Sequence, residues 1–260
     1  MKIKKMGPTG RLSQGSEWIY GLNPVLEAIR AGRNIQGLFI SPGRHDSPRI
    51  LEIKKEAAQR NISIVKADAQ FFYSTFPKGH QGVAAKVLPK AYCDLEELLR
   101  IPITKGETPL FIILDCIEDP RNFGAILRVA DAAGIHGVII QSYRSAPIGP
   151  EVSKSSAGAV EYVPVSMVAN IKHAVNEIKE RGITVVGADA GADNVIWDID
   201  LKIPLALIIG AEGKGMRKTV KEHCDILVRI PMLGKINSLN VSVAAGVVLF
   251  EILRQKMKNN

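Results

Sequence analysis

The chain has 260 residues, of which 46% are apolar and 23% charged, a balance that allows a buried core and excludes a disordered or fibrous protein. The formal net charge of +8 is uneven, because residues 1–90 hold 15 Lys and Arg against 6 Asp and Glu, whereas residues 91–260 hold 19 against 20. This asymmetry predicts two domains, the first suited to a polyanion such as nucleic acid. A basic surface that serves only solubility fits the charge equally well.

The first domain is expected to be a small α/β unit over residues 18–88. Residues 1–17 mix Lys, Gly, Ser and Pro without periodicity, which indicates a mobile basic arm. Hydrophobic periodicity then predicts, in chain order, a helix over 24–31 with Asn23 as N-cap, a strand over 37–40, a helix over 48–60, a strand over 62–65, a short helix and a strand over 82–87.

The second domain is expected over residues 109–260, after a linker over 89–108 that is rich in Pro and Gly and carries one amphipathic turn, 94–100. Its predicted strands are continuous apolar runs: 110–114, 137–140, 183–186, 205–209 and 226–230. The predicted helices are 122–133, 151–158, 170–181, 216–223 and 238–256. Such runs predict a mostly parallel sheet buried on both faces, with ligands at the carboxyl ends of the strands.

The cysteine and histidine pattern argues against a metal site and against disulfides. Cys93, Cys116 and Cys224 form no C-x-x-C pair, and the five histidines have no metal-ligand spacing. The longest apolar stretch, 241–250, is too short to span a bilayer, and no signal peptide is recognised. We therefore expect a cytoplasmic protein without a metal ion.

Three segments after predicted strands carry unusual residues. In the first segment, 115–130, Arg121 and Arg128 are seven apart on one helix face near an N-terminus capped by the Asp119-Pro120 turn or by Asn122. Two guanidinium groups near helix N–H donors suit an anion, although two solvated arginines explain the pattern as well.

The second segment, 210–216, holds three glycines around Glu212 and fits either a close backbone approach to a ligand or a glycine-rich helix cap. It does not have the spacing of a phosphate-binding P-loop. The third segment, 230–246, predicts a helix capped by Asn237 or Ser238, with Asn240 in its first turn. Its polar residues fit a site or simple capping.

Together these segments resemble, in order and spacing, the three motifs of the SpoU/TrmH family of RNA ribose 2′-O-methyltransferases. The matching residues are Asn122-x-Gly124-Ala125-x-x-Arg128-x-Ala130, Gly210-x-Glu212-x-x-Gly215, and Ile230-Pro231-Met232-x-Gly234 followed by Ser238-Leu239-Asn240-Val241-Ser242. In the first domain, Tyr20-Gly21-x-Asn23-Pro24 and His80-Gln81-Gly82-Val83-Ala84 look like the substrate-binding module of the family. The resemblance extends from Trp18 to Gln255.

The resemblance implies an α/β catalytic domain with a deep trefoil knot, a small N-terminal α/β RNA-binding domain, S-adenosylmethionine as cofactor and a homodimer with the 238–256 helix near its interface. The implied catalytic residues are Arg128, Asn122, Glu212, Ser238 and Asn240. The implied cofactor-binding residues are Gly210, Ile230, Met232, Ser238, Leu239 and Asn240. Arg128 would be a base or, because arginine is normally protonated, a stabiliser of the developing alkoxide, and Glu212 could orient it by a bidentate pair.

The implied reaction is methylation of a ribose 2′-hydroxyl in RNA, and the domain order is similar to that of family members that act on a guanosine of large-subunit ribosomal RNA. Transfer RNA is the alternative substrate, and a catalytically silent RNA-binding assembly factor is the alternative to an enzyme. The aromatic residues that could stack on bases, or form the core instead, are Tyr20, Phe71, Phe72, Tyr73 and Phe76.

Overall fold

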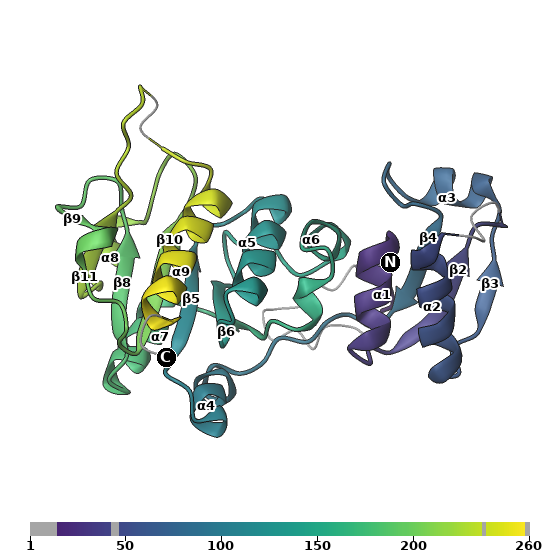
Figure 1. Ribbon diagram of the computed structural model, residues 1–260, viewed down its shortest axis with the longest axis horizontal. Helices are drawn as coiled ribbons and strands as arrows, with labels where there is room; N and C mark the ends of the chain where they lie inside the picture. The colour runs from purple at the N-terminus through teal and green to yellow at the C-terminus, as the bar shows by residue number, and fades with distance from the viewer. Residues whose placement is uncertain (1–14, 43–46, 236–237, 258–260) are drawn as a thin grey trace, which may run out of the picture. The chain divides into compact units, whose positions relative to one another are not determined.

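The computed structural model describes residues 15–42, 47–235 and 238–257 (Figure 1). The contacts divide the chain into two compact units, residues 1–90 and 91–260. The predicted basic arm, residues 1–17, lies almost entirely outside the described residues. No helix among the described residues is long and apolar enough to cross a membrane.

Unit 1 is a four-stranded sheet with helices on both faces. Its elements are β1 (Glu17–Tyr20), α1 (Leu22–Arg30), β2 (Ile35–Ile40), α2 (Pro48–Gln59), β3 (Ile64–Lys66), α3 (Ala69–Thr75) and β4 (Val83–Val87). The strand order is β1-β4-β2-β3, with β4 antiparallel to β1 and β2, and β2 parallel to β3. One sheet face packs against α1 and α2 through aliphatic side chains, and the other carries an aromatic cluster beside α3.

The start of α1 differs from the expected one. Asn23 is not its N-cap, because the helix begins at Leu22 and Gly21 precedes it with a φ of 100°. The Leu22 N–H donates instead to Oε1 of Gln81 at 3.1 Å. A side chain 59 positions away therefore satisfies a backbone donor that the sequence analysis assigned to a local cap.

Unit 2 is a seven-stranded parallel sheet in the order β7-β6-β5-β10-β8-β11-β9. The strands are β5 (Leu110–Asp115), β6 (Gly137–Gln141), β7 (Val165–Val168), β8 (Thr184–Ala188), β9 (Asn194–Val195), β10 (Leu205–Gly210) and β11 (Ile226–Arg229). The α-helices are α4 (Leu95–Lys105), α5 (Pro120–Ala132), α6 (Pro150–Ser155), α7 (Ile171–Glu180), α8 (Lys218–Lys221) and α9 (Val241–Met257). Short 3-10 helices span Ala159–Glu161 and Ile196–Asp198.

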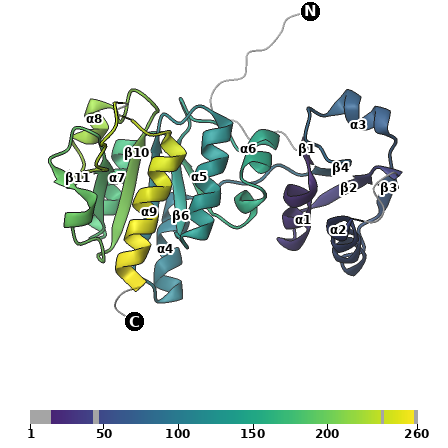
Figure 2. The same ribbon diagram turned by 45° about the horizontal axis from the view of Figure 1, so that its top comes forward.

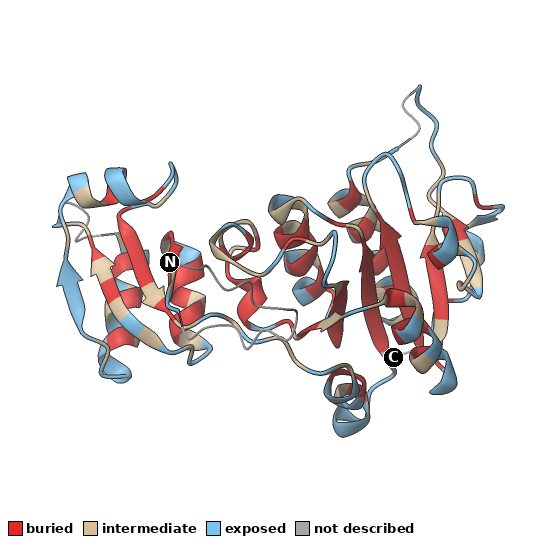
Figure 3. Cartoon of the chain, turned by 180° about the vertical axis from the view of Figure 1, so that it is seen from behind, coloured by how far each residue is buried: buried red, intermediate tan, exposed pale blue. Residues whose placement is uncertain are grey.

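Both faces of this sheet are covered, as the continuous apolar strands predict. One face packs against α5 and α9, and the other against α4, α7 and α8 (Figures 1 and 2). The central strands β5 and β10 are buried along their whole length (Figure 3). The α/β class and the parallel sheet are therefore confirmed, whereas the trefoil knot stays a prediction.

The segment expected as a linker contains α4, which belongs to unit 2. Leu98 and Leu99 of this helix are buried in the core beside α7. Pro102, one of the Pro and Gly residues that suggested a linker, lies inside the helix and is buried, so it is part of the packing. The strands β1, β7 and β9 were not expected, and all three lie at the edges of their sheets.

The caps of α5 and α9 settle two choices that the sequence leaves open. Asp119 caps α5, since its side chain accepts a hydrogen bond from the N–H of Arg121 at 2.8 Å. Asn240 directly precedes α9 and its Oδ1 accepts from the N–H of Ser242 at 3.0 Å. The expected cap Ser238 lies outside the helix, and Asn237 lies outside the described residues.

Candidate active site

Three polar side chains from three different segments meet at the carboxyl edge of the large sheet. Asn122 lies in the first turn of α5, Glu212 follows β10, and Asn240 precedes α9. Nδ2 of Asn240 donates to Oδ1 of Asn122 at 3.0 Å and to Oε2 of Glu212 at 3.2 Å. Nδ2 of Asn122 donates to the same Glu212 oxygen at 3.3 Å. We call these three residues the amide–carboxylate cluster.

Asn240 serves the helix and the cluster at the same time. Its Oδ1 accepts from N and Oγ of Ser242, which fixes the side chain at the start of α9. Its amide nitrogen is then directed at Asn122 and Glu212. An aspartate would cap the helix equally well but has no N–H to donate, so an asparagine is the residue type that performs both tasks.

The structure does not bring Arg128 into this cluster. It lies on α5 six residues after Asn122, which places it about 240° further around the helix at 100° per residue. Its side chain is exposed, and no hydrogen bond or ion pair joins it to the described residues. The predicted pair between Glu212 and Arg128 is therefore absent, because the Glu212 carboxylate accepts from the two asparagine amides instead.

The turn before α5 is set by charge and burial. The hydrogen bond from the Arg121 side chain holds the pKa of the Asp119 carboxyl below its usual value, so this cap is ionised at neutral pH. Burial, and next the charge of Asp115, raise the pKa of the Cys116 thiol. A raised pKa lowers the fraction of thiolate, which is the nucleophilic form of cysteine.

A tight turn explains the glycines of the second segment, for which the sequence left both a close approach to a ligand and a helix cap open. A Cβ on Gly210 would lie 2.1 Å from the backbone of Gly215 and Met216, so the loop folds back against its own start. Gly213 and Gly215 have φ values of 76° and 65°, which L side chains rarely adopt. A hydrogen bond from Gly215 N to Ala211 O, 2.8 Å long, closes this tight turn around Glu212.

A buried ion pair anchors the same loop to the sheet. Asp115, the last residue of β5, is fully buried and is the register partner of Gly210. Its carboxylate accepts from the backbone N–H of Arg217 at 2.8 Å and from the guanidinium of Arg217 at 2.7 Å. Arg217 also donates to Oε1 of Gln141 on β6 at 2.6 Å. Asp115 therefore holds both ends of the loop that presents Glu212.

A pocket of about 390 Å³ lies beside Glu212. Five of the six residues expected to bind a cofactor line it, namely Gly210, Ile230, Met232, Ser238 and Leu239. Asn240, the sixth, is in the amide–carboxylate cluster and not in the lining. Ser238 lines the pocket, but no hydrogen bond joins it to the cluster within the described residues.

The sequence analysis missed one wall of this pocket. Ala188, the last residue of β8, and residues 189–191 directly after it line the pocket, as do Val228 and Ala244. The strand before this wall, β8, was predicted. Ligands bind at the carboxyl ends of parallel strands, and this rule would have indicated the loop after β8 as well. Arg217 was also missed, and no local sequence signal connects it with Asp115, which lies 102 positions earlier.

The pocket suits a nucleoside that carries a positive charge. Apolar side chains of Ile209, Val228 and Ile230 offer walls for a flat base. The charged residues in the lining are Asp189, Glu212 and Lys214, one net negative charge. Apolar walls, backbone at strand ends and net negative charge fit S-adenosylmethionine, whose sulfonium is cationic. Among the described residues, no cluster of His, Cys, Asp and Glu could hold a metal ion.

Comparison with protein families identifies both parts of the chain. The profile of the SpoU rRNA Methylase family matches residues 109–250, and that of the RNA 2′-O ribose methyltransferase substrate-binding domain matches residues 18–93.

Two relatives cover nearly the whole chain. The putative TrmH family tRNA/rRNA methyltransferase YacO of Bacillus subtilis is 39% identical over 94% of this chain and 98% of its own length. The 23S rRNA (guanosine-2′-O-)-methyltransferase RlmB of Pseudomonas aeruginosa is 41% identical over 93% and 98%. The crystal structure of the SpoU methyltransferase AviRb from Streptomyces viridochromogenes with AdoMet has a TM-score of 0.77 and 28% identity, covering 94% of this chain and 91% of that one.

We expect Arg217→Ala to lower the free energy of unfolding much more than the control Arg181→Ala does, because Arg217 anchors the second segment. Removing one partner of a buried pair costs roughly 3–5 kcal/mol, and the 35% exposure of Arg217 places Arg217→Ala at the lower end. Arg181→Ala removes an exposed pair with Glu177 on α7 and should cost less than about 1 kcal/mol. Urea denaturation of both variants followed by circular dichroism measures the difference. Equal losses of stability would contradict an anchoring role.

Proposed function

Because the chain belongs to the SpoU family of RNA 2′-O-ribose methyltransferases, we propose that it methylates a guanosine 2′-hydroxyl in large-subunit ribosomal RNA. The chain is an S-adenosylmethionine-dependent RNA methyltransferase, so the family resemblance and the cofactor expected from sequence are confirmed. The proposal adds the substrate, the residues and the assembly. It rests above all on the amide–carboxylate cluster beside the 390 Å³ pocket.

The pocket is the proposed cofactor site, held by the backbone and side chains of Gly210, Ile230, Met232, Ser238 and Leu239. When bound there, S-adenosylmethionine supplies a methyl group that its sulfonium charge already activates. The chain therefore needs to position the substrate more than to activate the donor. Asn240, expected to bind cofactor, is proposed to act from the cluster next to the pocket.

The amide–carboxylate cluster is proposed to position the ribose. Asn122 and Asn240 offer amide groups that can hydrogen-bond a hydroxyl or a phosphate oxygen, and Glu212 fixes both amides in place. Ser238 lies on the pocket wall and is proposed to contact the substrate or the cofactor. A ribose hydroxyl is a weak nucleophile, so alignment with the methyl group is the largest expected contribution.

Arg128 is proposed to stabilise the developing alkoxide or a neighbouring phosphate, not to abstract a proton, since arginine stays protonated. It is exposed on α5, and α5 packs against α9. Its guanidinium is therefore available to an RNA strand or to the site of another copy of the chain.

Ribosomal RNA is favoured by the two-domain architecture, which the relative named RlmB matches over nearly its full length. The excess of nine positive charges in residues 1–90 suits RNA phosphates. With ribosomal RNA as substrate, the protein works in the cytoplasm. The relative from B. subtilis is named for both tRNA and rRNA, so transfer RNA belongs in the test.

The proposed active form is a homodimer that buries one face of α9. Val243, Phe250 and Met257 are spaced seven apart and therefore share a helix face, and their exposed fractions are 51%, 48% and 67%. An apolar stripe on a helix that is otherwise packed on the sheet indicates a protein–protein contact. The family resemblance also implies a dimer interface near the 238–256 helix, the helix that carries this stripe.

Arg128→Ala is expected to lower methyl transfer to unmodified large-subunit ribosomal RNA by roughly 10²–10³-fold, because one group that stabilises developing charge is removed. Transfer of labelled methyl from S-adenosylmethionine, with the product mapped to the ribose, measures this effect. Arg100→Ala on α4, whose exposed side chain pairs with Glu96, is the matched control and should keep full activity.

Labelling of bulk transfer RNA instead of ribosomal RNA would overturn the proposed substrate but keep the chemistry. RNA binding without any labelling would overturn the proposed reaction. Full activity of Arg128→Ala would remove this residue from the site.

Phe250→Glu is expected to convert the protein to a monomer of 28.3 kDa, because a charge would be buried in the proposed interface. Light scattering coupled to size exclusion measures the mass, which should be twice that value for the wild type. Ile103→Glu changes an apolar residue on α4 that is 73% exposed, against 48% for Phe250, and should leave the dimer intact. A monomeric wild type would refute the proposed assembly.

A further inference from the structure

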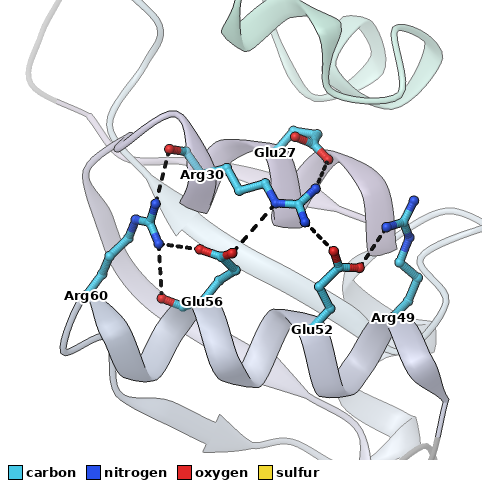
Figure 4. Close-up of polar contacts among 6 residues, drawn as sticks. All are labelled: Glu27, Arg30, Arg49, Glu52, Glu56 and Arg60. Carbon is cyan, nitrogen blue, oxygen red and sulfur yellow. Dashed lines mark hydrogen bonds and ion pairs between the residues drawn. The ribbon is translucent and has the colours of Figure 1, made fainter.

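The two faces of unit 1 differ in how their charges are used. On the α1–α2 face, three arginines are neutralised by three glutamates (Figure 4). Arg30 lies at the centre and pairs with Glu27, Glu52 and Glu56. The other two pairs are Arg49 with Glu52, 2.7 Å apart, and Arg60 with Glu56. These three guanidinium groups are occupied within the protein, so they are less available to RNA phosphates.

The opposite face carries the aromatic cluster and a positive balance. Residues 61–90, which include β3, α3 and β4, hold four lysines and only one acidic residue, Asp68. The Asp68 carboxylate is used as the N-cap of α3, where it accepts from Phe71 N at 2.8 Å. Lys78 lies in the loop between α3 and β4, is exposed, and has no ion-pair partner among the described residues.

The structure separates the aromatic residues that could stack on RNA bases from those that form the core. Tyr20, Phe72 and Phe76 are buried, with exposed fractions of 6%, 0% and 7%. Phe71 is half-buried within the same cluster. Tyr73 alone of the five is largely exposed, at 76%. Four of the five candidates are therefore needed for packing, and the fifth is directed to solvent.

Tyr73 is held by a stack that begins in the core. The His80 ring lies parallel to the buried Phe72 ring, with centroids 5.3 Å apart and an interplanar angle of 18°. The Tyr73 ring meets His80 edge-on at 5.2 Å. Because the outer ring rests on a fixed inner ring, ordering it on binding costs little conformational entropy.

The loop that carries His80 is itself rigidly connected. Gly82 N donates to Nδ1 of His80 at 3.0 Å, and Oε1 of Gln81 accepts from Leu22 N at 3.1 Å. Gln81 has a φ of 56°, a conformation that side-chain and backbone contacts on both sides maintain. The His80-Gln81-Gly82 motif thus connects α1 with β4 and supplies the ring on which Tyr73 rests. These structural contacts explain why the motif has these residues.

We propose that Tyr73 stacks on an unpaired base of the RNA substrate and that Lys78 contacts an adjacent phosphate. This inference rests on the proposed RNA substrate and assigns its contact surface in unit 1. An exposed aromatic ring with an exposed lysine five positions further along the chain offers what single-stranded RNA requires, since every base has a face for stacking and every nucleotide a phosphate. The occupied arginines on the α1–α2 face support the same choice of surface.

The test measures affinity for unmodified large-subunit ribosomal RNA by filter binding at several salt concentrations. Tyr73→Ala should weaken binding about tenfold, whereas Tyr73→Phe should bind within twofold of wild type because the ring is kept. The slope of log affinity against log salt should be unchanged in Tyr73→Ala and smaller by about 0.7 in Lys78→Ala, the value for one lost phosphate contact. Leu51→Ala on α2, an exposed apolar control, should have no effect.

In steady-state methylation, Tyr73→Ala should raise KM for RNA about tenfold and leave kcat unchanged. Binding of Tyr73→Ala within twofold of wild type, or an equal loss in Tyr73→Phe, would overturn the inference while methylation of ribosomal RNA continued. Affinity that depends on Tyr73 without any methyl transfer would overturn the proposed function and support the inference. Circular dichroism should show all four variants folded, because these side chains are exposed.

Discussion

The ion pair between the buried Asp115 and the half-buried Arg217 is the contact on which the proposed catalytic site depends. Asp115 ends the central strand β5 and is the register partner of Gly210, where the second segment begins. Arg217, just beyond that segment, returns to the same carboxylate through its backbone and its side chain. A loop fixed at both ends by one fully buried residue has little freedom. Glu212 is consequently presented at a defined place beside the pocket.

From this anchor, the parallel sheet brings the other two segments to the same edge. β5 and β10 are neighbours in the sheet, so Asn122, which follows β5, contacts Glu212, which follows β10. Asn240 completes the cluster because it caps α9, whose apolar side packs on the sheet. Unit 2 thus contains the proposed cofactor pocket and the polar groups, whereas the excess positive charge is in unit 1. The proposed chemistry and the proposed recognition of the substrate therefore belong to different units of one chain.

The sequence predicts the sheet of unit 2 well because its long strands are continuous apolar runs with no competing helical period. It fails for β7 and β9, the two edge strands, which are not continuous apolar runs, and for α4, whose segment suggested a linker through its Pro and Gly residues, the buried Pro102 among them. The residues of the amide–carboxylate cluster were expected only because their motifs resemble a known family. Local propensity could not have paired Asp115 with Arg217, nor shown that Glu212 contacts Asn122 and not Arg128. The residues in each of these contacts lie about a hundred positions apart in the chain.

The central claim is that residues from separate segments act as one unit on the substrate, and a double-mutant cycle on kcat tests it most directly. Asn122→Ala, Glu212→Ala and the double variant would be assayed at saturating RNA and S-adenosylmethionine, with folding verified by circular dichroism. The account predicts that the double variant loses much less activity than the product of the single losses, a coupling of roughly 0.5–3 kcal/mol, because each change breaks the same contact. Losses that simply multiply would contradict it.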